Sequence, residues 1–295
     1  MPRKAPAASR PKLTDAGRPA TFEVEAFNER GEMVPTAIAG EHPLTMYLDR
    51  RELVTLMTLG QAPEALAIGY LRNQRLVASI ADIAEVQVDW DTDSVAIVTR
   101  KRRDGRARAR AEALEARLGK RTVTTGCGQG TVFGGLMDEI DTLRLRSDVF
   151  LEDFQLFSLI EQVRKHETIY KQAGAVHGCA LAQKSADGAE ILMFVEDVGR
   201  HNAVDAIAGF MWLDAIDGSD KIFYTTGRLT SEMVIKCAQM GIPFLVSRSG
   251  LTKMGHDIAE KIGITMLGRA SGRHYLLFTG GERLVRSALQ PTALA

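Results

Sequence analysis

The sequence predicts an α/β protein in which a smaller, strand-rich N-terminal part precedes a mixed sheet covered by helices. Two observations support this prediction. In the first third of the chain, apolar and polar residues alternate in several short stretches, which is typical of half-buried strands. After about residue 158, short apolar runs alternate instead with segments of helical spacing that end at glycine, as in a sheet with helices on its faces.

The N-terminal part is expected to hold strands, hairpins and one helix. Residues 21–28 alternate in polarity and lead into a Glu-Arg-Gly turn, which predicts a strand that opens a hairpin. A further short strand is expected at 44–48. A proline, which suits the first turn of a helix, precedes apolar residues at helical spacing over 64–71. Residues 83–90 and 94–99 alternate on either side of Asp-Thr-Asp, which predicts a second hairpin.

A helix is expected to begin the C-terminal part. Ser158 and Glu161 have the spacing of a capping box, and the apolar residues from Leu159 to Ile169 are spaced as on one helix face. Gly174 would end that helix.

Strands and helices then alternate along the chain. Apolar runs at 175–182 and 191–195, joined by an Ala-Asp-Gly turn, predict a hairpin that makes the sheet mixed rather than purely parallel. The remaining expected elements are helix 202–212, strand 222–225, helix 231–240, strand 244–247, helix 252–262 and strands 264–267 and 274–278.

Length and composition set limits on organisation and partners. A chain of 295 residues has room for two modest domains, and we expect a disordered tail over 1–20, a small α+β domain over 21–122 and a larger domain over 123–290. The 37 Lys and Arg residues balance the 37 Asp and Glu residues, so bulk charge predicts no nucleic-acid partner.

The cysteine count and the apolar patterning suggest a location. Three widely spaced cysteines argue against a disulfide framework and for a reducing compartment. No apolar stretch is long enough for a bilayer span, and the basic N-terminus has no hydrophobic core after it, so no secretory signal is expected. We therefore expect a cytoplasmic protein that does not enter a membrane.

The densest charge run, from Arg100 to Arg110, has two interpretations. It suits a phosphate or nucleic-acid patch, or it is a solvated strand end and loop. The second is favoured because no aromatic residues are interleaved to stack on bases.

Cys127 is the candidate nucleophile. It lies in Thr-Thr-Gly-Cys-Gly-Gln-Gly, between two glycines and without an aliphatic neighbour to bury it. Such a loop would let a bulky electrophile reach the sulfur, and backbone amides outside any ladder would stabilise a thiolate. A glycine turn with an incidental cysteine explains the segment equally well.

Polar, glycine-containing turns follow three of the predicted strands, at 196–202, 226–231 and 279–283. Ligands bind beyond the carboxyl ends of strands in sandwiched sheets, and arginine forks with helix amides suit phosphate. The three turns together predict a ligand crevice. Asp197 alone is equally a helix cap, and His201 is either an acid/base group or a residue of the first helical turn.

His177 and Cys179 raise the question of a zinc site. A deaminase-type site needs His-x-Glu followed by Pro-Cys-x-x-Cys, whereas here Cys179 stands at the Glu position and the chain has no Cys-x-x-Cys. We therefore expect no metal, and we expect Cys179 and Cys237 to be core residues.

The run Glu-Asp-Val-Gly-Arg-His-Asn-Ala-Val-Asp at 196–205 resembles the signature of the FdhD/NarQ family of formate dehydrogenase accessory sulfurtransferases. The order of the other elements is similar as well, from Phe22 to Arg283. It comprises a glycine-flanked cysteine, a Val-His strand, a Thr-Gly-Arg turn, a Gly-Ile-Pro segment and a C-terminal turn.

The resemblance implies a fold, an activity and partners. It implies a C-terminal domain similar to cytidine deaminases but without their zinc site, often in a homodimer. Family members accept sulfur from a cysteine desulfurase as a persulfide. They transfer it to the molybdenum or tungsten bis(molybdopterin guanine dinucleotide) cofactor before that cofactor enters the catalytic subunit of formate dehydrogenase.

The resemblance also implies site residues. The position that carries the persulfide corresponds to Cys127. A thiolate is required there, and Lys120, Arg121 or loop amides would lower the thiol pKa from its reference of about 8.5. The expected cofactor-binding residues are Phe278, Thr279, Gly280, Gly281, Glu282 and Arg283, with Thr226, Gly227 and Arg228, and with Asp197, Arg200 and His201 to order the crevice. Arg228 and Arg283 would be the anion clamps.

One departure from the family pattern leaves an alternative. The family usually has two cysteines separated by two residues, and Gly130 stands at the second position. A single thiol is enough to hold a persulfide, which keeps sulfur transfer as the first hypothesis. The alternative is a chaperone that binds and shields the cofactor with little sulfurtransferase activity.

Overall fold

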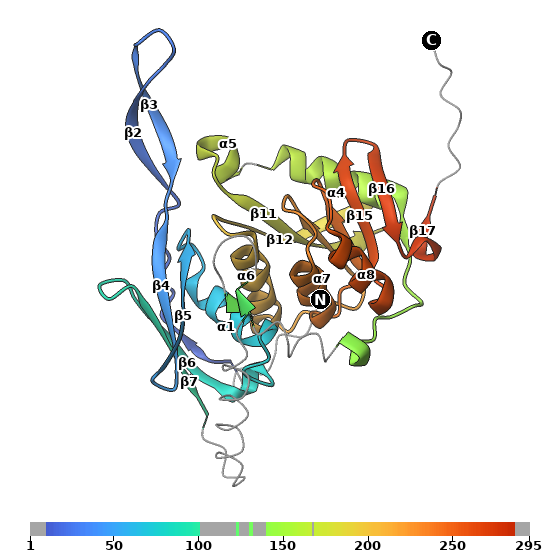
Figure 1. Ribbon diagram of the computed structural model, residues 1–295, viewed down its shortest axis with the longest axis horizontal. Helices are drawn as coiled ribbons and strands as arrows, with labels where there is room; N and C mark the ends of the chain where they lie inside the picture. Colours follow the sequence, from blue (N-terminus) through green and yellow to red (C-terminus); the bar gives the residue numbers. More distant parts are fainter. Residues whose placement is uncertain (1–9, 101–121, 124–129, 132–139, 167, 287–295) are drawn as a thin grey trace. The chain divides into compact units, whose positions relative to one another are not determined.

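The computed structural model describes residues 10–100, 122–123, 130–131, 140–166 and 168–286. The chain forms two compact units, each discontinuous in sequence (Figure 1). The first contains the residues before 140 together with 167–179 and 195–216, and the second contains the rest. The units therefore do not follow the expected boundary between 122 and 123, because two segments of the C-terminal half fold with the N-terminal part.

A sheet of five strands forms one layer of the first unit in the part that the structure describes, in the order β1-β6-β7-β4-β5. Its strands are β1 (Lys12–Leu13), β4 (His42–Leu48), β5 (Arg51–Thr58), β6 (Ile83–Asp89) and β7 (Ser94–Thr99). The predicted hairpin over 83–99 is confirmed as the antiparallel pair β6–β7, and the strand predicted at 44–48 is the greater part of β4. Apolar side chains on one face of this sheet, Leu44, Met46 and Val86 among them, join the core of the first unit.

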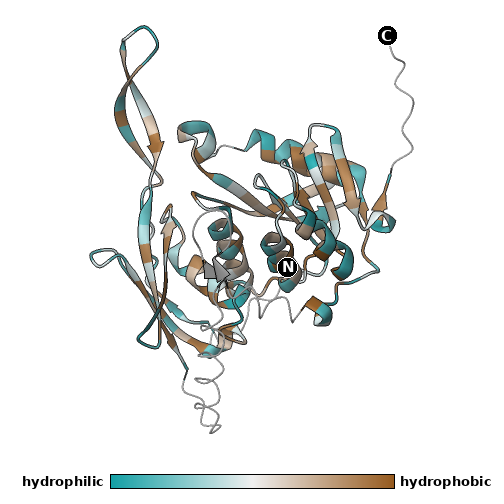
Figure 2. Cartoon of the chain, in the orientation of Figure 1, coloured by the Kyte–Doolittle hydropathy of each residue, from teal (hydrophilic) through white to brown (hydrophobic). Residues whose placement is uncertain are grey.

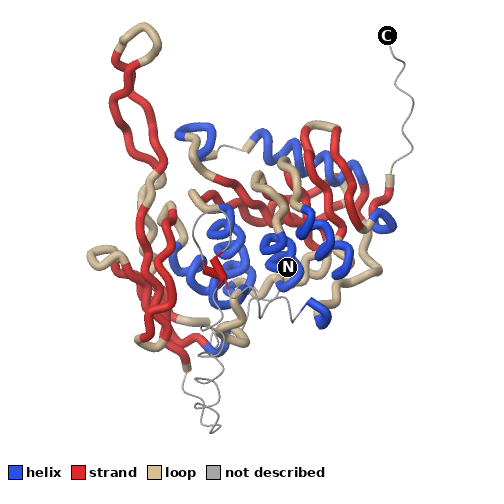
Figure 3. Tube along the Cα trace, in the orientation of Figure 1, coloured by secondary structure: helices blue, strands red, loops and turns tan. Residues whose placement is uncertain are grey.

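A separate two-stranded hairpin consists of β2 (Thr21–Phe27) and β3 (Met33–Ala39), as the alternation at 21–28 predicts. Figure 3 draws its strands as two long red stretches joined by a tan turn, and Figure 2 shows that the turn is hydrophilic. Gly31 takes a positive φ of 75° in that turn, a conformation that suits glycine. The short helix α5 (Ile169–Ala173) packs against β3.

The expectation of a disordered tail over 1–20 is wrong for residues 10–20. β1 pairs in parallel with β6, and the Trp90 indole donates a 2.5 Å hydrogen bond to the Ala16 carbonyl. The Arg18 guanidinium lies 4.7 Å from the centre of the Trp90 ring and donates to the Trp90 carbonyl. A strand of two residues is too short to show a pattern, and its partners come from far along the sequence.

Two helices cross at very short range in the first unit. They are α1 (Pro63–Asn73), which begins at the predicted proline, and α6 (Arg200–Leu213), which contains the helix predicted at 202–212. A Cβ atom on Gly69 would lie 1.6 Å from the Asp205 carbonyl oxygen, and one on Gly209 would lie 1.9 Å from the Ala65 carbonyl oxygen. The backbones therefore touch where neither helix has a side chain.

The second sheet has six strands among the described residues, in the order β12-β11-β13-β14-β15-β16. Its strands are β11 (His177–Ser185), β12 (Gly188–Asp197), β13 (Lys221–Thr225), β14 (Phe244–Ser247), β15 (Thr265–Ser271) and β16 (His274–Thr279). β13, β14 and β15 are parallel, and β16 is antiparallel to β15. The prediction of a mixed sheet is confirmed.

Helices cover this sheet as the alternation of elements predicts. Leu156 and Leu159 of α4 (Asp153–Lys165) share a buried cluster with Tyr224 and Val246, which lie on one face of the sheet. The helices α7 (Ser231–Gln239) and α8 (Lys253–Ile262) connect successive parallel strands. Right-handed crossovers place both on the opposite face.

The predicted start of this helix at Ser158 and its predicted continuation to Gly174 are both wrong. The helix begins at Asp153, where the Gln155 side chain accepts from the Glu152 amide, and Ser158 lies inside it as an acceptor for Gln162. It ends at Lys165, and a second helix, α5, begins after Thr168, whose hydroxyl accepts from the Lys171 amide. Glu152 and Gln155 have the same three-residue spacing as Ser158 and Glu161, and the earlier pair is the one that caps the helix.

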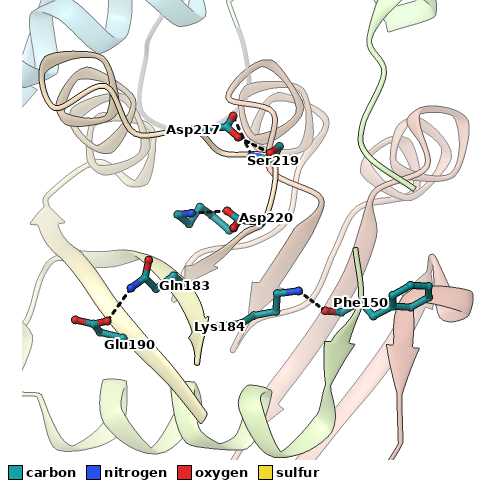
Figure 4. A network of polar contacts seen from close by, with 8 residues as sticks. Phe150, Gln183, Lys184, Glu190, Asp217, Ser219 and Asp220 are labelled. Atoms are coloured by element: carbon teal, nitrogen blue, oxygen red, sulfur yellow. Dashed lines mark hydrogen bonds and ion pairs between the residues drawn. The ribbon is translucent and has the colours of Figure 1, made fainter. Parts of the chain in front are cut away.

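Polar contacts fix the β11–β12 edge of the second unit (Figure 4). The Gln183 amide donates to Glu190 across the hairpin at 2.8 Å, and Lys184 donates to the Phe150 carbonyl at 2.6 Å. Asp217 binds the Ser219 hydroxyl in the segment before β13. The segment before α4 is thus tied to this sheet.

No helix in the part of the chain that the structure describes is both long and apolar enough to cross a membrane.

The close crossing of α1 and α6 leads to a prediction about the stability of the protein. Gly69→Ala should lower the free energy of unfolding by about 3 kcal/mol, because the new methyl group meets backbone atoms that move only if the helices separate. Urea denaturation measures this. Gly250→Ala is the control, since no atom lies within 4 Å of a Cβ there, and it should change stability by less than about 0.5 kcal/mol. Equal stability of the two variants would contradict the crossing.

Candidate functional site

The segment 196–205 joins the end of β12 to the first turns of α6, and it lies within the first unit. Gly199 is the residue before the helix, with an extended backbone. The strand-to-helix turn predicted from the sequence is therefore present. Its polar residues make contacts that explain why so many of them are buried.

Asp197 is the most highly connected of these residues. It is 6% exposed, and among the described residues it accepts four hydrogen bonds. The Thr58 hydroxyl (2.5 Å) and the Leu59 amide (3.0 Å) reach one oxygen. The Gly199 amide (3.0 Å) and the Asn202 side chain (2.7 Å) reach the other. Burial raises the pKa of the carboxyl, and these donors, which favour the carboxylate, oppose that shift.

Two other polar residues of the segment also bind within the first unit. Glu196 accepts from the amides of Ile169 and Tyr170, at the start of α5. The Asn202 amide donates to the Met57 carbonyl as well as to Asp197. These contacts hold the turn to the end of β5 and to α5.

Asp205 provides the remaining link. It accepts a 2.7 Å hydrogen bond from Asn73, the last residue of α1, beside the glycine crossing. Arg72 donates to the Ala208 carbonyl at 2.8 Å in the same region. The polar side chains of the segment therefore position α6 against α1 and β5.

Arg200 and His201 are the first two residues of α6 and are 4% and 3% exposed. Of the two interpretations of His201, the structure supports a residue of the first helical turn, and an acid/base role stays a prediction. For Asp197, the geometry supports a positioning role, and its predicted part in cofactor binding is untested.

Thr226, Gly227 and Arg228 form the turn between β13 and α7 in the second unit. The Gly227 amide donates to Thr225, and the Gly227 carbonyl accepts from the Ser247 hydroxyl at 2.6 Å. This turn is therefore joined to the end of β14. The Arg228 side chain is exposed.

Phe278 to Arg283 runs from the end of β16 into a short 3-10 turn over Gly281–Arg283. The Thr279 hydroxyl donates to the Ile264 carbonyl (2.7 Å), and Arg283, which is buried, donates from Nη1 to the Gly263 carbonyl (2.6 Å). Arg283 thus binds the C-terminal end of α8, where a cation is favoured by the helix dipole.

The predicted crevice with both Arg228 and Arg283 as clamps needs correction. β16 runs antiparallel to β15, so its carboxyl end lies beside the amino ends of the parallel strands. Arg228 follows the carboxyl end of β13, whereas Arg283 binds just before β15 begins. The two arginines lie at opposite edges of the sheet. The sequence reasoning treated all strand ends alike and did not account for the reversed last strand.

Cys127, Lys120 and Arg121 lie outside the described residues. The flanking strands β8 (Thr122–Val123) and β9 (Gly130–Thr131) are antiparallel partners, with Val123 opposite Gly130. Gly130, which stands where the family pattern has a second cysteine, is thus part of β9. Residues 101–110 of the basic run also lie outside the described residues.

The other two cysteines are where the sequence predicts them. Cys179 lies in β11 and Cys237 in α7, and both side chains are fully buried. The prediction that they are core residues is confirmed. Within the described ranges, no three His, Cys, Asp or Glu side chains are grouped closely enough to hold a metal ion.

A family model described as "FdhD/NarQ family" matches residues 39–285. The chain belongs to this family. The sulfur carrier protein FdhD of Listeria innocua is 29% identical over 265 residues, which is 89% of this chain and 95% of that protein. The protein of the same name from Bacillus subtilis is 26% identical over 87% of this chain and 94% of its own length.

A solved structure supports the fold. The crystal structure of a candidate formate dehydrogenase accessory protein from Desulfotalea psychrophila is similar with a TM-score of 0.69 and 24% sequence identity. It matches 90% of this chain and 100% of its own. The mixed α/β fold is thereby confirmed, and the similarity to cytidine deaminases stays a prediction.

Sequence reasoning missed several residues that build the site. Thr58 and Asn73 were not singled out, although they bind Asp197 and Asp205 of the segment. Gly69 and Gly209 were likewise not recognised. A signal was available for Asn202 and Asp205, because two polar residues three apart in an otherwise apolar helix need buried partners.

Asp197→Asn should lower the free energy of unfolding by about 2 kcal/mol or more. The amide group of Asn brings donors against the N–H groups of Leu59 or Gly199, which then stay buried without an acceptor. Urea denaturation measures the loss, and amide hydrogen exchange at Leu59 and Gly199 should become faster. Asp187→Asn, in an exposed turn, is the control and should be neutral. Unchanged exchange at both amides would rule out the positioning role.

Proposed function

We propose that this protein carries sulfur during the maturation of a formate dehydrogenase. Cys127 accepts sulfur as a persulfide from a cysteine desulfurase, and the sulfur passes to the molybdenum or tungsten bis(molybdopterin guanine dinucleotide) cofactor before its insertion into the catalytic subunit. The family match over residues 39–285 is the observation that carries the proposal. Relatives named sulfur carrier protein, similar over most of their length, support it.

The loading step is a thiol exchange. The Cys127 thiolate attacks the terminal sulfur of the desulfurase persulfide, a new S–S bond forms at Cys127, and the desulfurase cysteine leaves as a thiolate. Because the thiolate is the nucleophile, the loop must lower the pKa of Cys127. Glycines on both sides leave room for the donor enzyme, and Lys120 and Arg121 supply positive charge nearby in sequence.

The guanylated cofactor is the substrate of the second step. We propose that the Thr226–Arg228 and Phe278–Arg283 turns of the second unit bind this cofactor, each at its own edge of the sheet. Arg200 and His201, at the start of α6 in the first unit, are proposed as further cofactor-binding residues. The described residues support a division of roles, since Asp197 and Asn202 already bind one another and the end of β5. We propose that these two hold the turn in which Arg200 and His201 lie. We also propose that the protein is cytoplasmic and forms a homodimer.

Gly130 supports a second candidate function. A chain without the family's second cysteine is compatible with a chaperone that shields the cofactor and transfers little sulfur. The two functions differ in what they require of Cys127. Sulfur transfer needs its thiol, whereas shielding does not.

Incubation with a cysteine desulfurase and cysteine should add the mass of one or more sulfur atoms to the wild-type protein. Peptide mapping should place the sulfur on the peptide that contains Cys127 and not on those with the buried Cys179 and Cys237. Cys127→Ala should abolish the addition and lower formate dehydrogenase activity in cells at least tenfold. Equal loading of Cys127→Ala would refute the carrier. Normal maturation by Cys127→Ala would favour the chaperone.

The substrate class has a separate test. The protein, purified without oxygen, is denatured and any released ligand is identified by mass spectrometry. A guanine-containing pterin supports the proposal. Stoichiometric recovery of a different nucleotide would argue against it.

A further inference from the structure

The β2–β3 hairpin of the first unit exposes large apolar side chains (Figure 1). Phe27 and Met33 are opposite each other beside the turn, and they are 71% and 55% exposed. Farther from the turn, Phe22 and Ile38 form a second opposed pair, and both are also exposed. Single exposed apolar residues are ordinary, whereas several on one narrow element mark a place where another molecule binds.

Glutamates share a face of the hairpin with the pair beside the turn. Side chains two positions apart in a strand point to the same side, so Glu23 and Glu25 lie on the face of Phe27. No Lys, Arg or His in the described ranges forms an ion pair with Glu23 or Glu25. Residues 21–39 contain four glutamates and one arginine, although the whole chain has a formal net charge of zero. This face is therefore both apolar and acidic.

Contacts within the first unit hold the base of the hairpin. The Gly40 amide donates to the Ala20 carbonyl at 2.8 Å, and the rings of Phe22 and His42 meet edge to face with centres 6.0 Å apart. The helix α5 packs against β3, and Glu196 binds the first amides of α5. A two-stranded hairpin alone is marginally stable in water, so these contacts keep it ordered. A preformed element loses less entropy when it binds.

The same face is poorly suited to a second copy of this chain. Two hairpins related by a two-fold axis and packed through it would bring Glu23 and Glu25 close to equivalent carboxylates. Pro35 has no N–H group, so β3 lacks a complete row of donors for a further strand.

The size of the hairpin also argues against packing of face on face. Two strands of seven residues cover about 23 Å by about 10 Å. Contact through one such face buries much less than the roughly 1,000 Å² of a stable interface. A groove that encloses both edges and the turn would bury more.

We propose that the β2–β3 hairpin is a docking arm for a partner protein that has an apolar groove lined by Lys or Arg side chains. The groove takes up Phe27 and Met33, and its cations pair with Glu23 and Glu25. The choice of proteins for the test rests on the proposed function, because a sulfur carrier must meet both its sulfur donor and the enzyme that it matures.

Biolayer interferometry with a purified cysteine desulfurase and with the purified catalytic subunit of formate dehydrogenase tests the docking arm. The full-length variant Phe27→Gln and Met33→Gln should bind at least one of them about tenfold or more weakly than the wild type, because buried apolar anchors dominate interface energies. The control is Phe150→Gln and Met254→Gln, the same residue types at 50% and 51% exposure, and it should bind within about twofold of wild type.

A second variant tests the charges independently. Glu23→Gln with Glu25→Gln should weaken binding at low salt and make the affinity less sensitive to added salt. Asp187→Asn with Glu260→Gln removes the same charge from exposed positions elsewhere and should leave both the affinity and its salt dependence unchanged. If the apolar variant does not fold, the charge variant decides.

Three results would overturn the proposal. They are no binding of either protein to the wild type at micromolar concentration, wild-type affinity in both hairpin variants, and an equal loss in the controls. Light scattering that shows a dimer in the wild type and a monomer in the apolar variant would assign the hairpin to a second copy instead. Binding of the wild type to phospholipid vesicles, lost in the apolar variant, would assign it to a lipid surface.

The persulfide assay separates this inference from the proposed function. Sulfur on Cys127 of the wild type, together with unaltered partner binding by both hairpin variants, would remove the docking arm alone. Weaker partner binding by the hairpin variants, with no sulfur on Cys127 of the wild type, would support the docking arm and reject the carrier.

Discussion

The contact between α1 and α6 determines where most of the polar signature lies. Gly69 and Gly209 let the two backbones touch, and any side chain at either position would overlap a carbonyl of the other helix. Close approach of this kind fixes both the distance and the rotation of the helices. The fixed rotation brings Asp205 to Asn73, and it brings the start of α6 to the end of β5, where Asp197 and Asn202 find their partners.

The segment 196–205 therefore positions α6, in addition to carrying the family signature. Its carboxylates and its amide are used by Thr58, Leu59, Met57, Asn73 and the start of α5. Buried polar groups satisfied in this way specify one arrangement, because each alternative leaves a donor or an acceptor without a partner. Arg200 and His201, the first two residues of α6, are buried beside these contacts.

Strong local patterns made most of the fold predictable. The strand Phe244–Ser247 was predicted to the residue, and the glycine after α8 takes the left-handed conformation expected of a helix stop. The ordering of residues 10–18 was not predictable, because it depends on Trp90, which is remote in sequence. The close contact at Gly69 and Gly209 was not predictable for the same reason. The role of a glycine inside a helix becomes clear only when the backbone that packs against it is known.

The direction of one strand explains why the predicted site did not form a single crevice. A sequence gives the order of strands, whereas the edge at which each ends depends on whether its neighbour runs parallel. Because β16 is reversed, Arg283 binds the end of α8 at the amino edge of the parallel strands, whereas Arg228 follows the carboxyl end of β13.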